Sequence, residues 1–426
     1  MNRSALLIAL TIGFAVLAGV FAGAYFFGGR GGGGGGVPGG ERPLPAGMEA
    51  AEAAYARGDY EETLAQLLPL AESGVPLAQY RVGLMYDDGR GVTEDADAAI
   101  DWLGRALASG QGFTGVTDAE TRLGTLYFDK AAEQSEPADQ IDWLERSAGL
   151  GHAPAQAVLG GYFLQGVAVD RNLPRALELM RAAAEQGEIT AASNLGFLYQ
   201  SDDGGVDQDL EEALRWYRIA AEGGQARAQT IYASLLQAGV GGGENDLAEA
   251  AQWYLTASAQ GDPIAQARLG SLIAQDVISH PDPAVQAQYV GQAVQGGDQG
   301  ALTWLEGRAE ADDRFALGAL AQLYAAGEGV TQDEARAIEY LVEAAEAGHA
   351  VSQVELGRRY GAGEGFEQDY VQAHKWVNLA AASGDEGAAD ARAAYTQLMS
   401  PEQIEEAQEL ARAWTEARRA GAGQEE

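Results

Sequence analysis

The chain repeats itself about every 36 residues, and this repetition restricts its possible folds more than any other feature. Each unit begins with an apolar residue, here called the landmark, and its clearest copies have an aromatic residue four positions later. A glycine-rich acidic loop follows, then the pattern A-x-x-W and a closing glycine, as in LGFLYQSDDGGVDQDLEEALRWYRIAAEGG. The landmarks fall at Val82, Leu123, Leu159, Leu195, Ile231, Leu269, Leu320 and Leu356.

The apolar residues inside each unit have helical spacing, so the units are predicted to be pairs of helices. Ordering one unit costs about 50 kcal/mol of conformational entropy, at about 1.5 kcal/mol per residue. Burial would have to remove about 2,000 Å² of apolar surface from water to offset that cost. Because a lone pair of alanine-rich helices does not bury so much, every unit needs its neighbours. The repeats are therefore predicted to be all-α and to stack as a right-handed α-solenoid of helix-loop-helix units.

Three motifs recur in a fixed order: L-G-x-x-Y, G-x-G-V-x-x-D and A-x-x-W-Y-x-x-A-A-x-x-G. They resemble the Sel-one-like repeat family, the longer-looped relatives of tetratricopeptide repeats, and about eight repeats fill residues 76–385. Two units lack the glycine loop and have DKAAEQSEPADQ and QDVISHPDPAVQ instead. The array is irregular near 298–315, where GALTWLEGRAEADDRF predicts an extra helix or a decayed half-unit.

Both ends of the array have segments that are expected to cap it. Residues 48–75 predict a shorter N-terminal capping helix pair, and residues 386–426 predict C-terminal capping helices and a tail. The second segment contains Ser400-Pro401-Glu402-Gln403, which has the pattern of a capping box with proline at the first helical position. The apolar stripe expected to cover the last repeat consists of Ile404, Ala407, Ala411 and Trp414.

Residues 1–29 predict a transmembrane anchor. Between Arg3 and Arg30 lie 26 residues without a charge, a run that is long enough to cross a bilayer and exceeds the apolar core of a secretory signal. A cleaved signal peptide is the alternative, because Ala22 and Ala24 form an A-x-A pattern. Residues 30–47 are a Gly/Pro-rich linker. We expect a single-pass inner-membrane protein with periplasmic repeats, or, if the segment is cleaved, a protein secreted to the periplasm.

Composition excludes several classes of function. The chain has 63 acidic and 27 basic residues and a formal net charge of −36, so nucleic acid is excluded as a partner. It has no cysteine, which excludes disulfides, thiolate zinc sites, cysteine nucleophiles and lipid-bearing cysteines. No H-E-x-x-H, G-x-x-x-x-G-K-[ST] or G-x-S-x-G motif is present. We therefore predict no enzyme activity, no catalytic residues and no cofactor.

The acidic loops and histidines are predicted to be structural. The loop SDDGGVDQD, residues 201–209, has Gly204 and Val206 where a calcium loop needs oxygen ligands. We therefore expect this loop to be a turn that joins two helices and to bind no metal. His152 and His349 each follow a closing glycine, the position at which a polar side chain caps the next helix.

The predicted function is that of a protein–protein interaction scaffold or adaptor, because the resemblance implies that the first helices of the repeats line a concave groove. By analogy with tetratricopeptide geometry, positions five and two before the landmark and two, five and six after it face that groove. An envelope signalling regulator that restrains a sensor partner is the alternative, and a cell-wall-acting enzyme is a third, weaker one. The candidate partner-binding residues are Tyr80, Leu84, Thr125, Phe128, Phe197, Gln200, Leu236 and Arg358.

The failed ligand spacing of the acidic loops generates a prediction about chelation. If the glycines and aspartates of these loops only form turns between helices, EDTA in low-salt buffer removes no metal ion that the fold needs. We expect the melting temperature with EDTA to equal that without it, as followed by circular dichroism. A fall of several degrees that added calcium reverses would contradict the turn interpretation.

Overall fold

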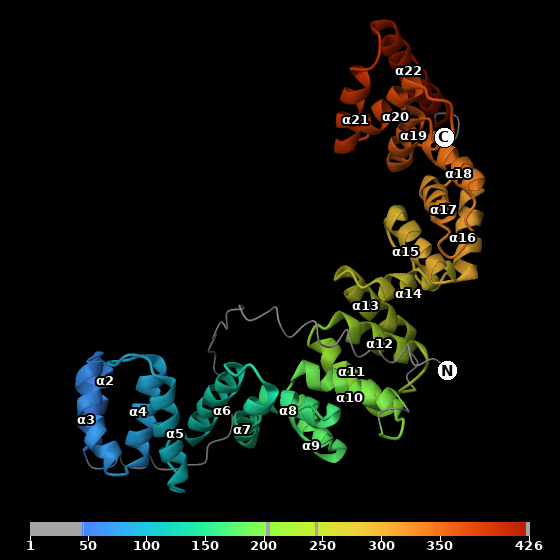
Figure 1. Ribbon diagram of the computed structural model, residues 1–426. Helices are drawn as coiled ribbons and strands as arrows, with labels where there is room; N and C mark the ends of the chain where they lie inside the picture. Colours follow the sequence, from blue (N-terminus) through green and yellow to red (C-terminus); the bar gives the residue numbers. More distant parts are fainter. Residues whose placement is uncertain (1–44, 46, 202–204, 243–245, 423–426) are drawn as a thin grey trace.

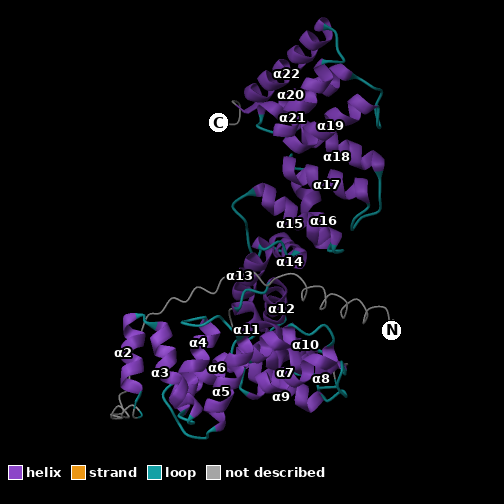
Figure 2. Ribbon diagram, turned by 60° about the vertical axis from the view of Figure 1, so that its left-hand side comes forward, coloured by secondary structure: helices purple, strands orange, loops and turns teal. Residues whose placement is uncertain are grey.

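The computed structural model describes residues 45, 47–201, 205–242 and 246–422. These residues form helices and no strand, and the helices follow one another along an elongated array that turns near α13 and α14 (Figures 1 and 2). The helices are α2 (Met48–Arg57), α3 (Tyr60–Glu72), α4 (Pro76–Asp88), α5 (Ala96–Ala108), α6 (Val116–Ala132), α7 (Pro137–Gly149), α8 (Ala153–Gln165), α9 (Leu173–Glu185), α10 (Ile189–Gln200), α11 (Leu210–Glu222), α12 (Ala226–Gln237), α13 (Asp246–Ala259), α14 (Pro263–Ala274), α15 (Pro283–Gln295), α16 (Gln299–Ala309), α17 (Arg314–Ala326), α18 (Glu334–Glu346), α19 (Ala350–Ala362), α20 (Tyr370–Ala382), α21 (Glu386–Thr396) and α22 (Pro401–Ala422).

The predicted anchor at residues 1–29 and nearly all of the linker at 30–47 lie outside the described residues. Within the part of the chain that the structure describes, no helix combines the length and apolar character needed to cross a membrane.

Helix pairs build the array, as the repeat predicts. The first helices of the eight units are α4, α6, α8, α10, α12, α14, α17 and α19, and each packs mainly on the second helix that follows it. Each second helix also packs on the first helix of the next unit, with α15 contacting both α16 and α17. The core therefore continues from repeat to repeat, and the all-α solenoid is confirmed.

The landmarks lie in this core, with one correction. Seven of them are at most 3% exposed, whereas Ile231 is only partly buried. In that unit Tyr232, which is 4% exposed, occupies the landmark position. The predicted register was wrong by one residue, because two apolar residues stand side by side and the next residue is Ala233, where most other units have glycine.

A glycine after the landmark allows the two helices of a unit to approach closely. A Cβ atom added to Gly270 would lie 2.0 Å from the backbone oxygen of Tyr289 on α15. At Gly196 it would lie 2.9 Å from the ring of Tyr217 on α11. No real Cβ tolerates such distances, so the small residue is a requirement of the packing.

The glycine-rich loops turn the chain and start the second helix. In the loop of residues 201–209, the Asp209 carboxylate accepts bonds from the amides of Glu211 and Glu212, at 3.1 and 3.0 Å. The Asp209 amide donates back to the Tyr199 carbonyl at 2.8 Å. Residues 202–204 of this loop lie outside the described residues. The aspartates at the ends of three similar loops cap their helices in the same way: Asp95, Asp333 and Asp369.

Glutamines connect five of the eight units to the helix pair before them. A glutamine three residues before the landmark donates its side-chain amide to a carbonyl near the C-terminal end of the preceding second helix, 3.0 to 3.3 Å away. This bond satisfies a carbonyl that has no partner inside its own helix. The five glutamines are Gln79, Gln156, Gln229, Gln266 and Gln353.

The irregular segment contains the extra helix that its sequence predicts. Helix α16 contacts α14, α15 and α17 and has no partner helix of its own. Its N-cap residue Asp298 accepts bonds from the amides of Gly300 and Ala301. The step between landmarks grows here because this single helix is inserted between two complete units.

The C-terminal end also begins as predicted. The Ser400 amide donates to the Gln403 side chain at 2.9 Å, and the Gln403 amide donates back to the Ser400 hydroxyl at 3.3 Å, which completes the capping box. Ala407 and Ala411 of α22 are buried, and the Trp414 ring lies 6.5 Å from that of Trp376 on α20.

Two glycine variants test the close approach of helices. Gly270→Ala places a methyl group on the Tyr289 carbonyl and is expected to cost at least about 1 to 3 kcal/mol of unfolding free energy. Gly161→Ala on α8 meets nothing within 4 Å and is expected to stabilise by up to about 1 kcal/mol through helix propensity. Urea denaturation followed by circular dichroism measures both. Equal stability of the two variants would contradict the packing described above.

Candidate partner-binding face

The first helices follow one another along the array, and some neighbouring first helices touch directly. At several junctions the N-terminus of one first helix meets the middle of the preceding one: Thr230 on α12 donates to the carboxylate of Asp262, the N-cap of α14, at 3.1 Å. A Cβ atom on Gly318 of α17 would lie 2.6 Å from the ring of His349, the N-cap of α19. Contacts of this kind keep neighbouring first helices in a fixed register.

Helix geometry decides which positions remain on the outside. Residues advance by about 100° each around a helix, so the positions five and one before the landmark and two after it share one side, away from the landmark. Large apolar side chains are exposed there: Phe197 at 50%, Ile264 at 55% and Val351 at 54%. The exposed residues at these three positions form what we call the first-helix face: Asp118, Thr125, Pro154, Thr190, Asn194, Phe197, Arg227, Ile264, Arg268, Gln322, Val351 and Arg358.

Three of the predicted partner-binding residues belong to this face. Thr125, Phe197 and Arg358 stand two residues after their landmarks and are exposed. Arg358 is also engaged in ion pairs, with Glu355 at 2.8 Å and Glu364 at 2.7 Å. Whether these residues contact a partner remains a prediction.

Three other predicted residues are half-buried between helices. Phe128 packs on the ring of His152, with 5.1 Å between the ring centroids. The side-chain oxygen of Gln200 accepts a bond from the Tyr217 hydroxyl at 3.0 Å. Leu84 lines a small hollow near the N-terminal end of the array.

Tyr80 and Leu236 are interior residues, which corrects their assignment to an exposed face. Tyr80 is 7% exposed, packs on Phe113 and donates its hydroxyl to Asp118 at 2.7 Å. Burial, together with the Asp118 carboxylate, raises the pKa of Tyr80 to about 12. Leu236 is 5% exposed. It was assigned an outward position because the predicted register of its unit was wrong by one residue. In the corrected register it corresponds to the buried Tyr199.

Sequence reasoning missed Arg227, Ile264 and Val351, which all stand five residues before a landmark. That position was among those expected to face the groove, but no residue was selected there. An apolar residue in the first turn of a helix, two residues after the capping position, is the signal that identifies Ile264 and Val351.

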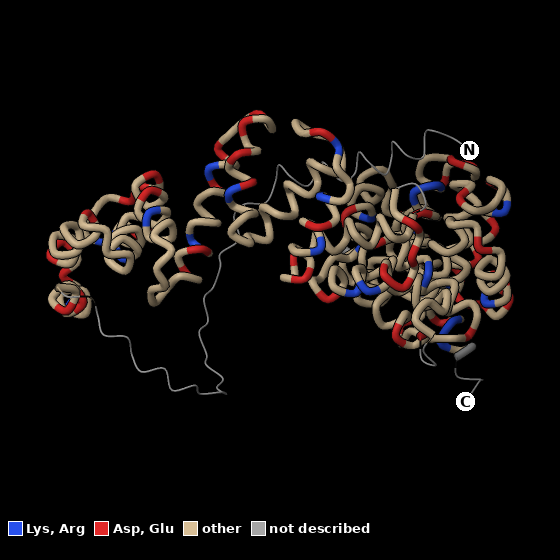
Figure 3. Tube along the Cα trace, turned by 90° about the horizontal axis from the view of Figure 1, so that it is seen from below, with Lys and Arg blue, Asp and Glu red and all other residues tan. Residues whose placement is uncertain are grey.

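The first-helix face has three arginines and one aspartate, Asp118, although the chain as a whole is strongly acidic. Acidic residues occur along the entire array (Figure 3). Arg227 and Arg268 are exposed on α12 and α14, and among the described residues neither forms an ion pair. Their guanidinium groups are therefore free to bind an incoming carboxylate or carbonyl.

The two histidines at N-cap positions do not cap. Asp262 and Asp385 accept backbone amide bonds at the equivalent position, whereas neither His152 nor His349 makes a side-chain cap bond. Their rings pack instead on phenylalanines of the preceding unit, Phe128 in one case and Phe315 in the other. Burial lowers the pKa of both histidines.

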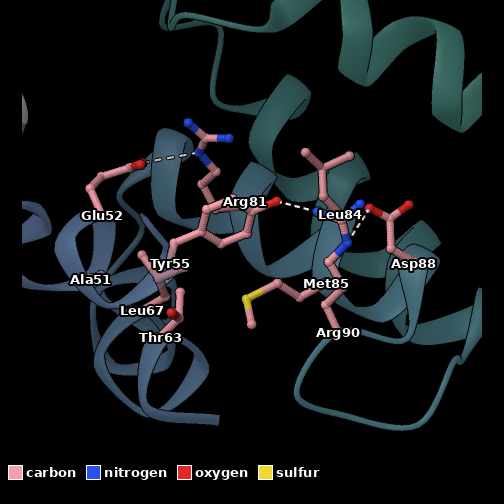
Figure 4. A pocket seen from close by; sticks show the side chains of 10 residues that line it. All are labelled: Ala51, Glu52, Tyr55, Thr63, Leu67, Arg81, Leu84, Met85, Asp88 and Arg90. Atoms are coloured by element: carbon pink, nitrogen blue, oxygen red, sulfur yellow. Dashed lines mark hydrogen bonds and ion pairs between the residues drawn. The ribbon is translucent and has the colours of Figure 1, made fainter. Parts of the chain in front are cut away.

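The hollow beside Leu84 is too small for a ligand. It lies between the N-terminal capping pair and α4 (Figure 4), and its volume is about 20 Å³, close to that of a single water. Arg81 donates to Glu52 across it at 3.1 Å, and Arg90 donates to the Tyr55 hydroxyl at 2.5 Å. The hollow is a polar joint between the capping pair and the first repeat.

The comparisons with known proteins identify the family. The model of the Sel1 repeat matches residues 76–111, 153–188, 189–225, 226–262, 314–349 and 350–385, just over half of the chain. The chain belongs to the Sel1 repeat family. The unmatched stretches 112–152 and 263–313 contain the two units that lack the glycine loop and the inserted helix α16.

The solved structures that match this chain include other Sel1 repeat proteins. A protective antigen present in uropathogenic Escherichia coli strains, which displays an SLR fold, is 23% identical; the match covers 86% of this chain and 84% of that chain with a TM-score of 0.44. A Sel1 repeat protein from Oxalobacter formigenes is 25% identical, with coverage of 58% and 99% and a TM-score of 0.40. An immunity protein from Pseudomonas aeruginosa is 18% identical, with coverage of 59% and 84% and a TM-score of 0.22. The comparison with curated proteins gives no match.

Proposed function

We propose that this Sel1 repeat protein is a scaffold or adaptor that binds a protein partner through its first-helix face. Sel1 repeat proteins generally mediate protein–protein interaction. The observation that carries the proposal for this surface is the exposure of large apolar side chains on three first helices, Phe197, Ile264 and Val351. The same face has Arg227 and Arg268, which form no ion pair with any residue that the structure describes. Aromatic and arginine side chains are enriched among the residues that contribute most to binding energy at protein interfaces.

The chemistry of the face indicates the kind of partner segment that fits. Phe197 and Ile264 offer apolar area that binding would remove from water. Arg227 and Arg268 offer guanidinium groups that suit carboxylates or backbone carbonyls. The proposed partner segment therefore has apolar side chains flanked by acidic ones and lies across several consecutive first helices.

We also propose that the protein is tethered to the inner membrane, with its repeats in the periplasm. The support is the uncharged run of 26 residues between Arg3 and Arg30, followed by a glycine-rich linker. A flexible linker of about 20 residues has a root-mean-square span of roughly 25 Å. The array would then search for its partner near the membrane surface.

Substitutions on the face test the scaffold function. Phe197→Ser combined with Ile264→Ser removes apolar contact area and is expected to reduce recovery of the partner at least about tenfold. The matched control is Leu398→Ser, because Leu398 is 61% exposed and lies outside the first-helix face. Affinity capture from native envelopes, with quantitative mass spectrometry, compares the variants with the unchanged protein.

Circular dichroism establishes that the double variant keeps its helices. Equal recovery of the same partner by the double variant would exclude the first-helix face as the binding surface. Failure of the unchanged protein to retain any specific partner would contradict the scaffold function itself.

The N-terminus of the mature protein tests the tether. We expect mass spectrometry of protein isolated from its native membrane to find residues 1–29 retained, because the apolar run is longer than a secretory signal core. The protein should then sediment with membranes and resist extraction by high salt. A mature N-terminus at Tyr25 together with a soluble protein would replace the anchor by a cleaved signal peptide.

A further inference from the structure

A polar cleft of about 380 Å³ lies among the last three helices. Helix α20 packs on both α21 and α22 (Figure 1). Helix α20 supplies His374 and Asn378, and α21 supplies Arg392 and Thr396, in each case two residues four apart and so on one side of the helix. Arg412 approaches from α22. The volume falls in the range of small-ligand sites, about 300 to 1,000 Å³.

The residues of this cleft depart from the repeat pattern in a concerted way. Arg392 stands eight residues after the closing glycine Gly384, which is the landmark position. All eight preceding landmarks, in the corrected register, are apolar or tyrosine and at most 4% exposed. Thr396 stands where most other units have an aromatic residue. His374 on α20 stands where the second helices of other units have Ile100, Leu214 and Ile338. Three positions that are apolar or aromatic in regular units are thus polar here.

The cleft is positive in a strongly negative chain. No carboxylate lines it, and neither Arg392 nor Arg412 forms an ion pair with any residue that the structure describes. Arg392 donates one bond to the Asn378 side-chain oxygen at 3.0 Å, and Arg412 donates to the Gln408 carbonyl at 3.3 Å. Because a guanidinium group carries five N–H donors, most of them remain free for a ligand.

His374 supplies a second, independent observation. Its side chain lines the cleft although the residue is 2% exposed, and within the described part of the chain its buried Nδ1 has no hydrogen-bond partner. A buried polar atom without a hydrogen-bond partner lowers the stability of the fold, so such an atom indicates that a ligand supplies the partner. Burial and the positive charge of Arg392 lower the pKa of His374, so the imidazole is neutral at pH 7.

A cap that only solubilises the end of the array does not account for these residues. Terminal repeats need a polar outer surface, but His374 is an interior residue. An arginine at a landmark position also forgoes the apolar packing that every other unit uses. Both choices lose stability locally, and a ligand that pairs with them would restore it.

We propose that this cleft binds a carboxylate group, either that of a peptide C-terminus or that of a small organic acid. The planar fork of an arginine matches the two oxygens of a carboxylate. Arg392 and Arg412 provide the charge, and Ile404 provides an apolar wall for the body of the ligand. The site is separate from the first-helix face and does not depend on its function.

Calorimetric titration of the full-length protein tests the site with three probes: the tripeptide Ala-Ala-Leu, its C-terminal amide, and succinate. We expect a carboxylate probe to bind and the amide not to bind. Binding of the free tripeptide identifies a peptide C-terminus as the source of the carboxylate, and binding of succinate alone identifies a small acid; either result supports the site.

Substitutions then locate the binding. Arg392→Leu restores the residue found at most landmarks, so it is expected to keep or raise the melting temperature while weakening carboxylate binding at least about tenfold. Arg412→Gln should weaken binding similarly. The matched control is Arg419→Gln, on the same helix and outside the cleft, which should bind as the unchanged protein does.

Two results would overturn the proposal. The first is that neither the tripeptide nor succinate binds at millimolar concentration, while Arg392→Leu only raises the melting temperature. The cleft would then be a polar cap and not a binding site. The other is carboxylate binding that survives both Arg392→Leu and Arg412→Gln, which would place the site elsewhere. Neither result bears on the partner captured through the first-helix face.

Discussion

Contact between neighbouring repeats is the constraint on which the rest of this structure depends. A single alanine-rich helix pair cannot bury enough apolar surface to offset its conformational entropy. The landmarks and second helices therefore form a series of core clusters along the chain, and the first of the two longest runs from Ala157 to Leu272 across several units. At the junctions, glutamines such as Gln229 and Gln353 donate into the end of the preceding helix. Each of these carbonyls also accepts the backbone amide of the closing glycine, so the glutamine adds a second bond that links the two units.

These contacts use specific sides of the first helix, and the remaining side is available for binding. The landmark and its glycine face the second helix, and the position two residues before the landmark often meets the neighbouring unit, as Thr230 does with Asp262. Positions such as those of Phe197 and Ile264 have no such role in the array. Their apolar character therefore has no explanation in packing between repeats, which is why a partner is the better explanation.

The fold could be predicted because the same sequence pattern recurs in every unit. The errors arose at residues whose side chains suit two different positions in that pattern. Helical period, loop caps such as Asp209 and the inserted helix α16 all follow from local sequence. The register failed at Ile231 because Tyr232 is also apolar, and only burial distinguishes them. Tyr80 was misplaced because an amphipathic ring suits both an exposed groove and an interface. His152 was expected to cap, but the phenylalanine of the preceding unit competes for its ring.

The same repetition explains why the two proposed sites differ in kind. A surface that lies on every first helix is extended, so it suits a partner that spans several repeats and gains affinity from many modest contacts. A cleft at the end of the array exists once, because only the last unit has no following repeat to fill the space above its helices. There a charged residue, Arg392, occupies the landmark position at a local cost in stability, which a bound carboxylate would offset. The end of a solenoid is therefore the place where this fold can accommodate a compact polar site, and the polar residues of this chain converge there.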